Sequence, residues 1–382
     1  MTDAPLIEAE IAVPSQDIRD DLPFFTKNLG FRLDEIFPAD DPAVAVLTGH
    51  GVRLRLDSGF KGPMPSLRLL CDNPAAFADG ATSLVAPNGM VVSIAQRNPP
   101  MKTPPTRHKF VVRRLADQAP WVIGRAGMHY RDLIPDRLGG SIIASHIRIP
   151  EGGPVPDMVH YHTVGFQLIF CLRGWVDLVY EDQGEPFRLF AGDCVIQPPE
   201  IRHQVLVSGD NLEVLEIGVP AEHVTTIDHE MVLPNGPANP DRVFHGQRFV
   251  HHREQDAVWQ AWRLPEFICR DTGINAGTNG VANVRIAKRP DADAEGADEG
   301  ERGSVNTHDC DILFTFVKTG TMSLSVEGET DVTLQAGDAF VIPPNLKSSY
   351  NYASKDIELI EISLPGDFLT MTDSPDDPHA AI

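Results

Sequence analysis

The sequence is short of basic residues. Its 382 residues include 54 Asp and Glu against 32 Lys and Arg, which gives a formal net charge of −22 at pH 7. Nucleic acids and anionic membrane surfaces attract proteins with the opposite charge balance. We therefore expect no nucleic-acid partner and no membrane partner.

The sequence also lacks three other features: cysteine motifs, long apolar runs and an N-terminal segment that resembles a signal peptide. The five cysteines are widely spaced, odd in number and contain no C-x-x-C, which argues against a disulfide framework or a thiolate zinc site. No apolar run approaches the ~20 residues that span a bilayer, and the acidic start MTDAPLIEAE does not read as a signal peptide. Together these absences predict a cytoplasmic protein.

Turn-forming residues are abundant, with 32 Pro and 31 Gly. Most apolar segments between them are short, rich in β-branched residues and alternate with polar residues. This sequence pattern is typical of a mostly β protein with many turns. The length and the hydrophobic content of 42% suffice for two or three domains with their own cores.

An internal repeat organises the chain after residue 107. Four segments of the first copy match four segments of the second in the same order: 130–153 with 269–290, 162–174 with 308–320, 189–203 with 334–348, and 212–220 with 357–365. For example, LFAGDCVIQPPEIRH matches LQAGDAFVIPPNLKS. Because chance does not produce four collinear matches, we interpret the two copies as duplicates.

The first copy carries a cluster of residues that could bind a metal. His160 and His162 are one residue apart in an extended segment, so both side chains project from one face of the strand. Gln167 begins the next apolar strand, and His203 opens the strand HQVLV after a Pro-Pro turn. Three imidazoles and one amide oxygen could therefore meet at one interior point and hold a metal ion.

These residues resemble the paired motifs of the cupin superfamily. The pattern G-x6-H-x-H-x4-Q-x6-G runs from Gly153 to Gly174 and is followed by G-x5-P-x4-H ending at His203. The resemblance implies two small β-barrels, a bicupin, with one divalent metal per chain held in the first barrel by His160, His162, Gln167 and His203. Among the possible ions, Fe(II) is favoured, with Mn, Ni or Zn as alternatives.

Gln167 stands where the cupin pattern usually has Glu. With four neutral ligands a divalent metal keeps its full +2 charge, so it should be a strong Lewis acid that attracts anionic ligands. The ferric state would be less favoured. By resemblance, Gln at this position recurs in sugar-processing cupins, which keeps redox-neutral chemistry open.

The second copy has lost most of these residues. Asn306, His308, Leu313 and Ser348 stand in register with the four candidate ligands of the first copy. A single imidazole rarely retains a divalent ion, so we expect the second barrel to bind no metal and to be mainly structural.

The N-terminal section resembles part of a vicinal-oxygen-chelate (glyoxalase and bleomycin-resistance) module. EAEIAVPSQDIRDDLPFFTKNLGF contains a predicted strand over IEAEIAV, then a short amphipathic helix and L-G-F, and APNGMVVSIAQ resembles the closing turn and strand of that fold. Predicted strands at AVAVLT and VRLRLD lie between them. We interpret this α+β section as a packing or dimerisation domain of a homo-oligomer, a dimer or a tetramer.

The predicted organisation follows from the repeat and from the proline-rich segment NPPMKTPPTR. The parts are a glyoxalase-like domain (1–97), a linker (98–107), cupin barrel 1 with the metal site (108–225), an inter-barrel connection (226–264), cupin barrel 2 with a degenerate site (265–368) and a tail (369–382).

The bicupin resemblance implies a metal-dependent enzyme for a small, oxygen-rich, anionic and metal-chelating substrate. Our first hypothesis is a dioxygenase, an oxidoreductase of the gentisate-cleaving type. The alternatives are a redox-neutral isomerase or lyase acting on a sugar acid, and a non-catalytic protein that binds a small molecule. Arg131, Arg148, Tyr161 and Trp175 are candidates to contact the substrate near the barrel mouth, although each such residue is more often a surface or packing residue.

Overall fold

The computed structural model describes residues 7–117, 120–290 and 303–373. Strands dominate these ranges, in agreement with the predicted mostly β fold. The chain divides into two compact units, Met1–Pro100 and Met101–Ile382. Within the described residues, no helix is both long enough and apolar enough to cross a membrane.

The N-terminal unit is a small α+β domain with two sheets. The four-stranded sheet has the order β1-β4-β3-β2, and the three-stranded sheet has the order β5-β7-β6. The predicted strand over IEAEIAV starts later than expected, at Ile11. The elements are β1 (Ile11–Pro14), α1 (Ile18–Pro23), the π-helical turn η1 (Phe24–Asn28), β2 (Arg32–Phe37), β3 (Val44–Gly49), β4 (Val52–Asp57), β5 (Leu67–Cys71), α2 (Pro74–Ala78), β6 (Ser83–Val85) and β7 (Val91–Gln96).

Local chemistry explains the predicted helix of this unit. The Asp17 carboxylate accepts a hydrogen bond from the backbone N–H of Arg19 and so caps α1. Ile18 and Phe25 are buried in the core of the unit together with Leu47 and Leu54 of the first sheet. The helix is therefore amphipathic, as the sequence predicts.

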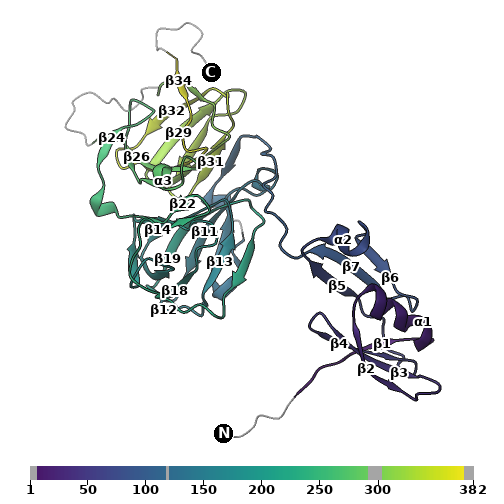
Figure 1. Ribbon diagram of the computed structural model, residues 1–382. Coiled ribbons are helices and arrows are strands. Elements are labelled where there is room, and N and C mark those ends of the chain that lie inside the picture. The colour runs from purple at the N-terminus through teal and green to yellow at the C-terminus, as the bar shows by residue number, and fades with distance from the viewer. Residues whose placement is uncertain (1–6, 118–119, 291–302, 374–382) are drawn as a thin grey trace. The chain divides into compact units, whose positions relative to one another are not determined.

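The first barrel consists of two facing sheets (Figure 1). One sheet has the order β23-β17-β14-β19-β11-β10-β9 and the other β16-β15-β18-β13-β20. The strands are β9 (Val122–Ile123), β10 (His129–Asp132), β11 (Ile143–Ile149), β12 (Gly153–Pro154), β13 (His160–Thr163), β14 (Phe166–Arg173), β15 (Trp175–Tyr180), β16 (Phe187–Phe190), β17 (Cys194–Ile196), β18 (His203–Ser208), β19 (Leu212–Val219), β20 (Val224–Ile227) and β23 (Val250–His252).

The second barrel repeats this plan strand by strand. Its sheets have the orders β24-β25-β26-β33-β28-β31-β8 and β30-β29-β32-β27-β34. The strands are β8 (Val111–Arg113), β24 (Trp259–Ala261), β25 (Ile268–Asp271), β26 (Asn283–Lys288), β27 (Asn306–His308), β28 (Ile312–Thr319), β29 (Thr321–Val326), β30 (Val332–Gln335), β31 (Ala339–Ile342), β32 (Ser348–Ala353), β33 (Glu358–Leu364) and β34 (Thr370–Thr372). The shared plan shows that the sequence repeat is a repeat of structure.

The remaining elements of the C-terminal unit are short. They are the 3-10 turns η2 (Leu115–Asp117), η3 (Arg125–Gly127), η4 (Arg137–Gly139) and η5 (Glu254–Asp256), the helix α3 (Ile274–Gly277) and the hairpin strands β21 (Val243–Phe244) and β22 (Gln247–Arg248).

Each barrel is completed by a strand from outside its own repeat. β8 lies at the start of the segment predicted as cupin barrel 1 (108–225) but pairs with β31 of the second barrel. Conversely, β23 lies in the segment between the two repeats and pairs with β17 of the first barrel. The two barrels therefore share their outer strands.

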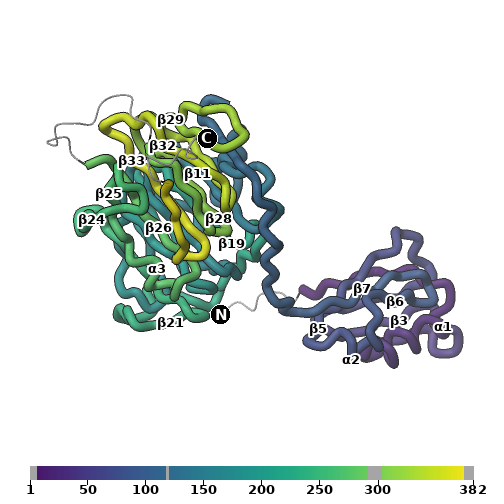
Figure 2. Tube along the Cα trace, turned by 90° about the horizontal axis from the view of Figure 1, so that it is seen from above, coloured from purple at the N-terminus to yellow at the C-terminus, as the bar shows by residue number. Residues whose placement is uncertain are grey.

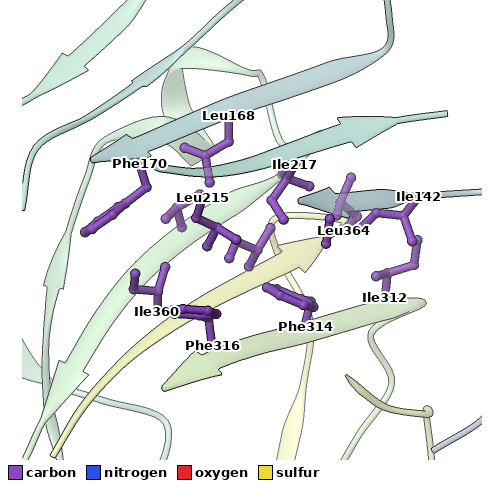
Figure 3. Close-up of a cluster of buried hydrophobic side chains, with 14 of the residues drawn as sticks. Ile142, Leu168, Phe170, Leu215, Ile217, Ile312, Phe314, Phe316, Ile360 and Leu364 are labelled. Atoms are coloured by element: carbon purple, nitrogen blue, oxygen red, sulfur yellow. The ribbon is translucent and has the colours of Figure 1, made fainter. Parts of the chain in front are cut away.

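A continuous apolar core joins the barrels, and strand alternation explains it. Phe166, Leu168 and Phe170 of β14 point into this shared core, where they meet Phe314 and Phe316 of β28 (Figure 3). Figure 2 shows β26 and β28 lying over β11 and β19. The alternate residues of β14, among them Gln167, therefore face the interior of the first barrel.

Candidate metal centre

Three histidines meet inside the first barrel. His160 and His162 lie on one face of β13, and His203, the first residue of β18, is the antiparallel partner of His160. Their ring centroids are 4.2 to 5.3 Å apart, and one ring nitrogen of each lies within 4.8 Å of the others. All three are buried, with 0%, 8% and 3% of their surfaces exposed. This is the arrangement that the H-x-H pattern and the returning strand predict.

The Nδ1 atoms of these histidines are held by neighbouring groups. Nδ1 of His160 donates to the carbonyl oxygen of Met158 at 2.7 Å, and Nδ1 of His203 donates to that of Ile201 at 3.0 Å. Nδ1 of His162 lies 2.9 Å from the Thr225 hydroxyl. A backbone carbonyl that accepts from Nδ1 fixes the ring orientation and leaves the Nε2 lone pair for a metal.

Burial keeps the three imidazoles neutral. Loss of solvation is the main cause that lowers the pKa of each. The second cause is Arg125 for His160 and the neighbouring histidines for His162 and His203, and the pKa of His162 falls to about 2. Neutral imidazole is the form that coordinates a metal. The electrostatics of the site therefore agree with the geometry.

Gln167 supplies an unpaired amide oxygen in the same barrel. Its Nε2 donates to Oε1 of Glu216 at 2.7 Å, whereas its own Oε1 is buried and accepts no hydrogen bond from the described residues. A buried acceptor without a partner costs about 1–3 kcal/mol. Imidazole nitrogens and an amide oxygen are donor types that fit a divalent cation. The structure brings the three histidines together, whereas Gln167 is not among the residues that line the cavity beside them.

The histidines lie at the wall of a cavity of about 290 Å³. Its wall is mostly apolar. The aliphatic residues include Ile147, Ile169, Val176, Leu178, Val205 and Val214. Such a volume accommodates a small organic molecule, and its apolar wall limits the access of water.

Two charged residues that the sequence analysis did not propose for the site also line this cavity. Arg125 donates from Nη2 to Nε2 of His160 at 3.0 Å, and its Nη1 forms an ion pair with the buried Asp157. The Glu216 carboxyl faces the cavity from β19, and burial raises its pKa. The sequence does contain a signal for Glu216, because it is a charged residue within the apolar strand LEVLEIGV.

His223 is a third residue that sequence reasoning did not connect with the site. It lines the cavity, and its ring centroid is 5.4 Å from that of His162. Its sequence segment, HVTTIDHEM, spans the predicted boundary between cupin barrel 1 and the inter-barrel connection at residues 225 and 226. The structure instead continues it into β20, which pairs with β13.

The four candidate substrate contacts lie elsewhere. Arg131 is 1% exposed and bonds to the Gly337 carbonyl between the barrels, and Arg148 bonds to Glu213. Tyr161 alternates with the two histidines, so it faces away from them and stacks against Arg202, and Trp175 stacks against Arg188. None of the four is on the cavity wall.

The equivalent position in the second barrel is filled by an ion pair. Arg263 donates from Nε and Nη2 to Glu361, with both side chains buried. Asn306 accepts a hydrogen bond from the same guanidinium at 3.4 Å. In the part of the chain that the structure describes, the first barrel holds the one group of three metal-ligating side chains.

Comparisons with known proteins agree with this fold. Residues 145–218, which lie in the first barrel, match the cupin domain family. Among solved structures, salicylate 1,2-dioxygenase from Pseudaminobacter salicylatoxidans superimposes with a TM-score of 0.51 at 14% identity, covering 71% of this chain and 90% of that chain. A mutant of Bacillus subtilis oxalate decarboxylase also gives 0.51, at 10% identity, with 70% and 81% covered.

The described fold is thus that of the bicupins, as predicted. No curated protein matches the sequence significantly. The resemblance of the N-terminal unit to a vicinal-oxygen-chelate module stays a prediction.

Proposed function

We propose that the first barrel binds one divalent metal and that the protein is a metal-dependent dioxygenase for a small anionic, metal-chelating substrate. The observation that carries this proposal is the set of three neutral histidines at the wall of a mostly apolar cavity. His160, His162 and His203 would hold the ion, and Gln167 would contribute its unpaired Oε1.

A divalent ion in this position supplies Lewis acidity, and iron also supplies reactivity toward O2. The residues of the first barrel favour both the Lewis acidity and the reactivity toward O2. Because the four donors are neutral, the positive charge of the ion is not reduced by a ligand and favours a substrate that binds as an anion. The guanidinium of Arg125 at the cavity wall adds to this preference.

The cavity wall contributes in a second way. Aliphatic side chains from β11, β14, β15, β18 and β19 surround the histidines. They exclude bulk water, which strengthens the electrostatic interactions inside and protects reactive species from hydrolysis. A flat aromatic or short aliphatic hydroxy-acid fits these conditions.

Oxygen consumption tests the proposal. The metal-free protein is reconstituted separately with Fe(II), Mn(II), Ni(II) and Zn(II), and each form is offered hydroxy-carboxylates, catechols and enediolate-forming sugar acids in an oxygen electrode. We expect Fe(II)-dependent O2 uptake that matches product formation. Product formed at an undiminished rate under strict anaerobiosis would contradict the dioxygenase assignment.

A redox-neutral isomerase or lyase is the second candidate, and Glu216 favours it. Its carboxyl group lines the cavity, and carboxyl groups commonly transfer protons in such reactions. One of the two structural neighbours is a dioxygenase and the other is a decarboxylase. The fold is therefore compatible with oxygen-dependent chemistry and with lyase chemistry. The anaerobic arm of the same experiment separates the two candidates.

A further inference from the structure

Arg125 of the first barrel and Arg263 of the second are equivalent residues. Each stands four positions after a tryptophan, in W-V-I-G-R and W-Q-A-W-R. Each also follows the edge strand of its sheet, β9 or β24, and precedes the next strand, β10 or β25. The two arginines therefore enter their barrels from the same place in the fold.

Their possible acid partners are equivalent as well. Glu216 lies opposite Ile169 of β14, and Glu361 lies opposite Thr315 of β28, at the same point of matching strand pairs. In the second barrel Arg263 is paired with Glu361. In the first barrel the Glu216 carboxylate accepts a hydrogen bond from Gln167, and Arg125 instead contacts His160 and Asp157.

The contact between Arg125 and His160 competes with metal binding. Nδ1 of His160 already donates to Met158, so Nε2 carries the lone pair of the ring. That lone pair either accepts from Nη2 of Arg125 or coordinates a metal ion, because one lone pair cannot do both. Coordination by His160 therefore releases Nη2 of Arg125.

The second barrel indicates Glu216 as the alternative acceptor. The side chains of Arg125 and Glu216 line the same cavity. The Arg125 side chain is 37% exposed, so it has room to move, whereas the Asp157 side chain is 2% exposed and fixed by the backbone N–H of Val205. The second barrel shows what the completed pair looks like.

We propose that Arg125 is a positioning residue with two alternative partners: it hydrogen-bonds His160 when that ring is not a ligand, and it pairs with Glu216 when His160 coordinates the metal. This inference rests on the proposed metal site but not on the proposed reaction. Metal binding would therefore move the Arg125 guanidinium from the edge of the cavity toward its interior. Arg125 thereby acts on the metal through His160 and Glu216, without touching the ion.

Metal affinity measured in a double-mutant cycle tests this inference. Affinity for Zn(II) and Mn(II) is measured by competition with a chromophoric chelator for the wild type, Glu216→Gln, Arg125→Gln and the double variant. Glutamine at 216 still accepts from Gln167, so Gln167 keeps its hydrogen bond. We expect Glu216→Gln to weaken binding about tenfold in the wild type, because the charged pair is lost in the metal-loaded state.

The same substitution should have a clearly smaller effect in the Arg125→Gln background. If Glu216→Gln lowers the metal affinity by an equal or larger factor in the Arg125→Gln background, the inference is overturned. Glu216 would then act on the metal without Arg125. Arg148→Gln serves as the matched control, since Arg148 bonds to Glu213 and does not line the cavity. This control should leave the effect of Glu216→Gln unchanged.

A crystal structure of the Zn(II)-loaded protein gives an independent readout. We expect the Arg125 guanidinium within hydrogen-bond distance of the Glu216 carboxylate. A guanidinium still bound to Asp157 alone, with His160 coordinated, would overturn the inference. A wild type that binds neither metal would overturn the metal site itself, whereas metal binding without O2 uptake would contradict only the proposed reaction.

Discussion

Arg131 and Arg270 form reciprocal hydrogen bonds across the two barrels. Nη2 of Arg131, in β10, donates to the carbonyl oxygen of Gly337 at 2.7 Å, and Nη2 of Arg270, in β25, donates to that of Gly192 at 2.8 Å. Each acceptor is the glycine of the Gly-Asp turn in the opposite barrel. Both arginines are almost fully buried, so the repeated motif R-D joins the barrels.

The first prediction follows from this arrangement. Arg131→Leu should lower the free energy of unfolding by about 2–3 kcal/mol, because it leaves buried acceptors without their charged donor. Metal content should not change, since Arg131 is away from the cavity. Urea unfolding and elemental analysis measure the two quantities, and Arg148→Leu, at a half-exposed position, should change stability by no more than about 0.5 kcal/mol. Loss of metal at unchanged stability would place Arg131 in the site instead.

The second prediction concerns the ligands. His160→Ala and His203→Ala should each reduce bound metal to roughly a tenth or less of the wild-type content. His308→Ala, at the equivalent position of the second barrel, should leave it unchanged, because its neighbours Asn306 and Ser348 are poor ligands. Elemental analysis after gel filtration decides between these outcomes. Equal metal content in the wild type and the three variants would contradict the assignment of His160 and His203 as ligands.

The third prediction concerns the charge of the centre. Gln167→Glu should retain the metal, since a carboxylate is a stronger ligand than an amide. It should weaken binding of anionic ligands about tenfold, because the net charge of the centre falls by one unit. Gln167→Leu copies the second barrel, which has Leu313 at this position, and should weaken metal binding. Calorimetric titration with an anionic chelating ligand measures the first effect, and unchanged affinity would show that Gln167 does not face the ion.

The fourth prediction concerns pH. The pKa of His162 is lowered from 6.5 to about 2, so between these values the unfolded chain binds a proton that the folded protein does not. The free energy of unfolding therefore does not depend on this residue above about pH 6.5. Below that pH it decreases by about 1.4 kcal/mol per pH unit because of His162. Urea unfolding of the metal-free protein from about pH 7 to about pH 5 measures the slope. His162→Gln should flatten it, whereas the exposed His229→Gln should not.

The fifth prediction concerns the buried pair of the second barrel. Arg263→Met should lower the free energy of unfolding by about 3–5 kcal/mol, because Glu361 is left as an uncompensated buried charge. The double change with Glu361→Leu should recover most of this loss. If the double variant is instead as unstable as the sum of both single variants, the pair carries no coupling.

The sequence was sufficient to predict the duplicated barrels and the meeting of the three histidines. The reason is local: alternation along a strand places His160 and His162 on one face, and the Pro-Pro turn before His203 returns the chain to them. The matching Gly-Asp turns fixed the correspondence between the two copies. No distance between remote segments had to be known for these predictions.

Arg125, Glu216 and His223 could not be placed in the same way. Arg125 reaches His160 from a loop after a short edge strand, and no periodicity specifies where a long side chain on such a loop will point. Glu216 is one of two repeated glutamates, and the sequence alone could not show that its equivalent, Glu361, has an arginine partner while Glu216 contacts Gln167. The exchange of β8 and β23 between barrels escaped prediction because three-residue strands carry too little pattern.

That exchange also bears on how the chain could have evolved. Residues 111–113 complete the barrel without the histidine cluster, and residues 250–252 complete the barrel that has it. Separating the chain between residues 225 and 226 would take each of these strands away from the barrel that it completes. It would leave β17 and β31 as unpaired sheet edges, which invites aggregation. A change of ligand residues in one barrel leaves this exchange of strands intact. The two copies can therefore diverge in their sites, while neither becomes an independent domain without a new edge strand.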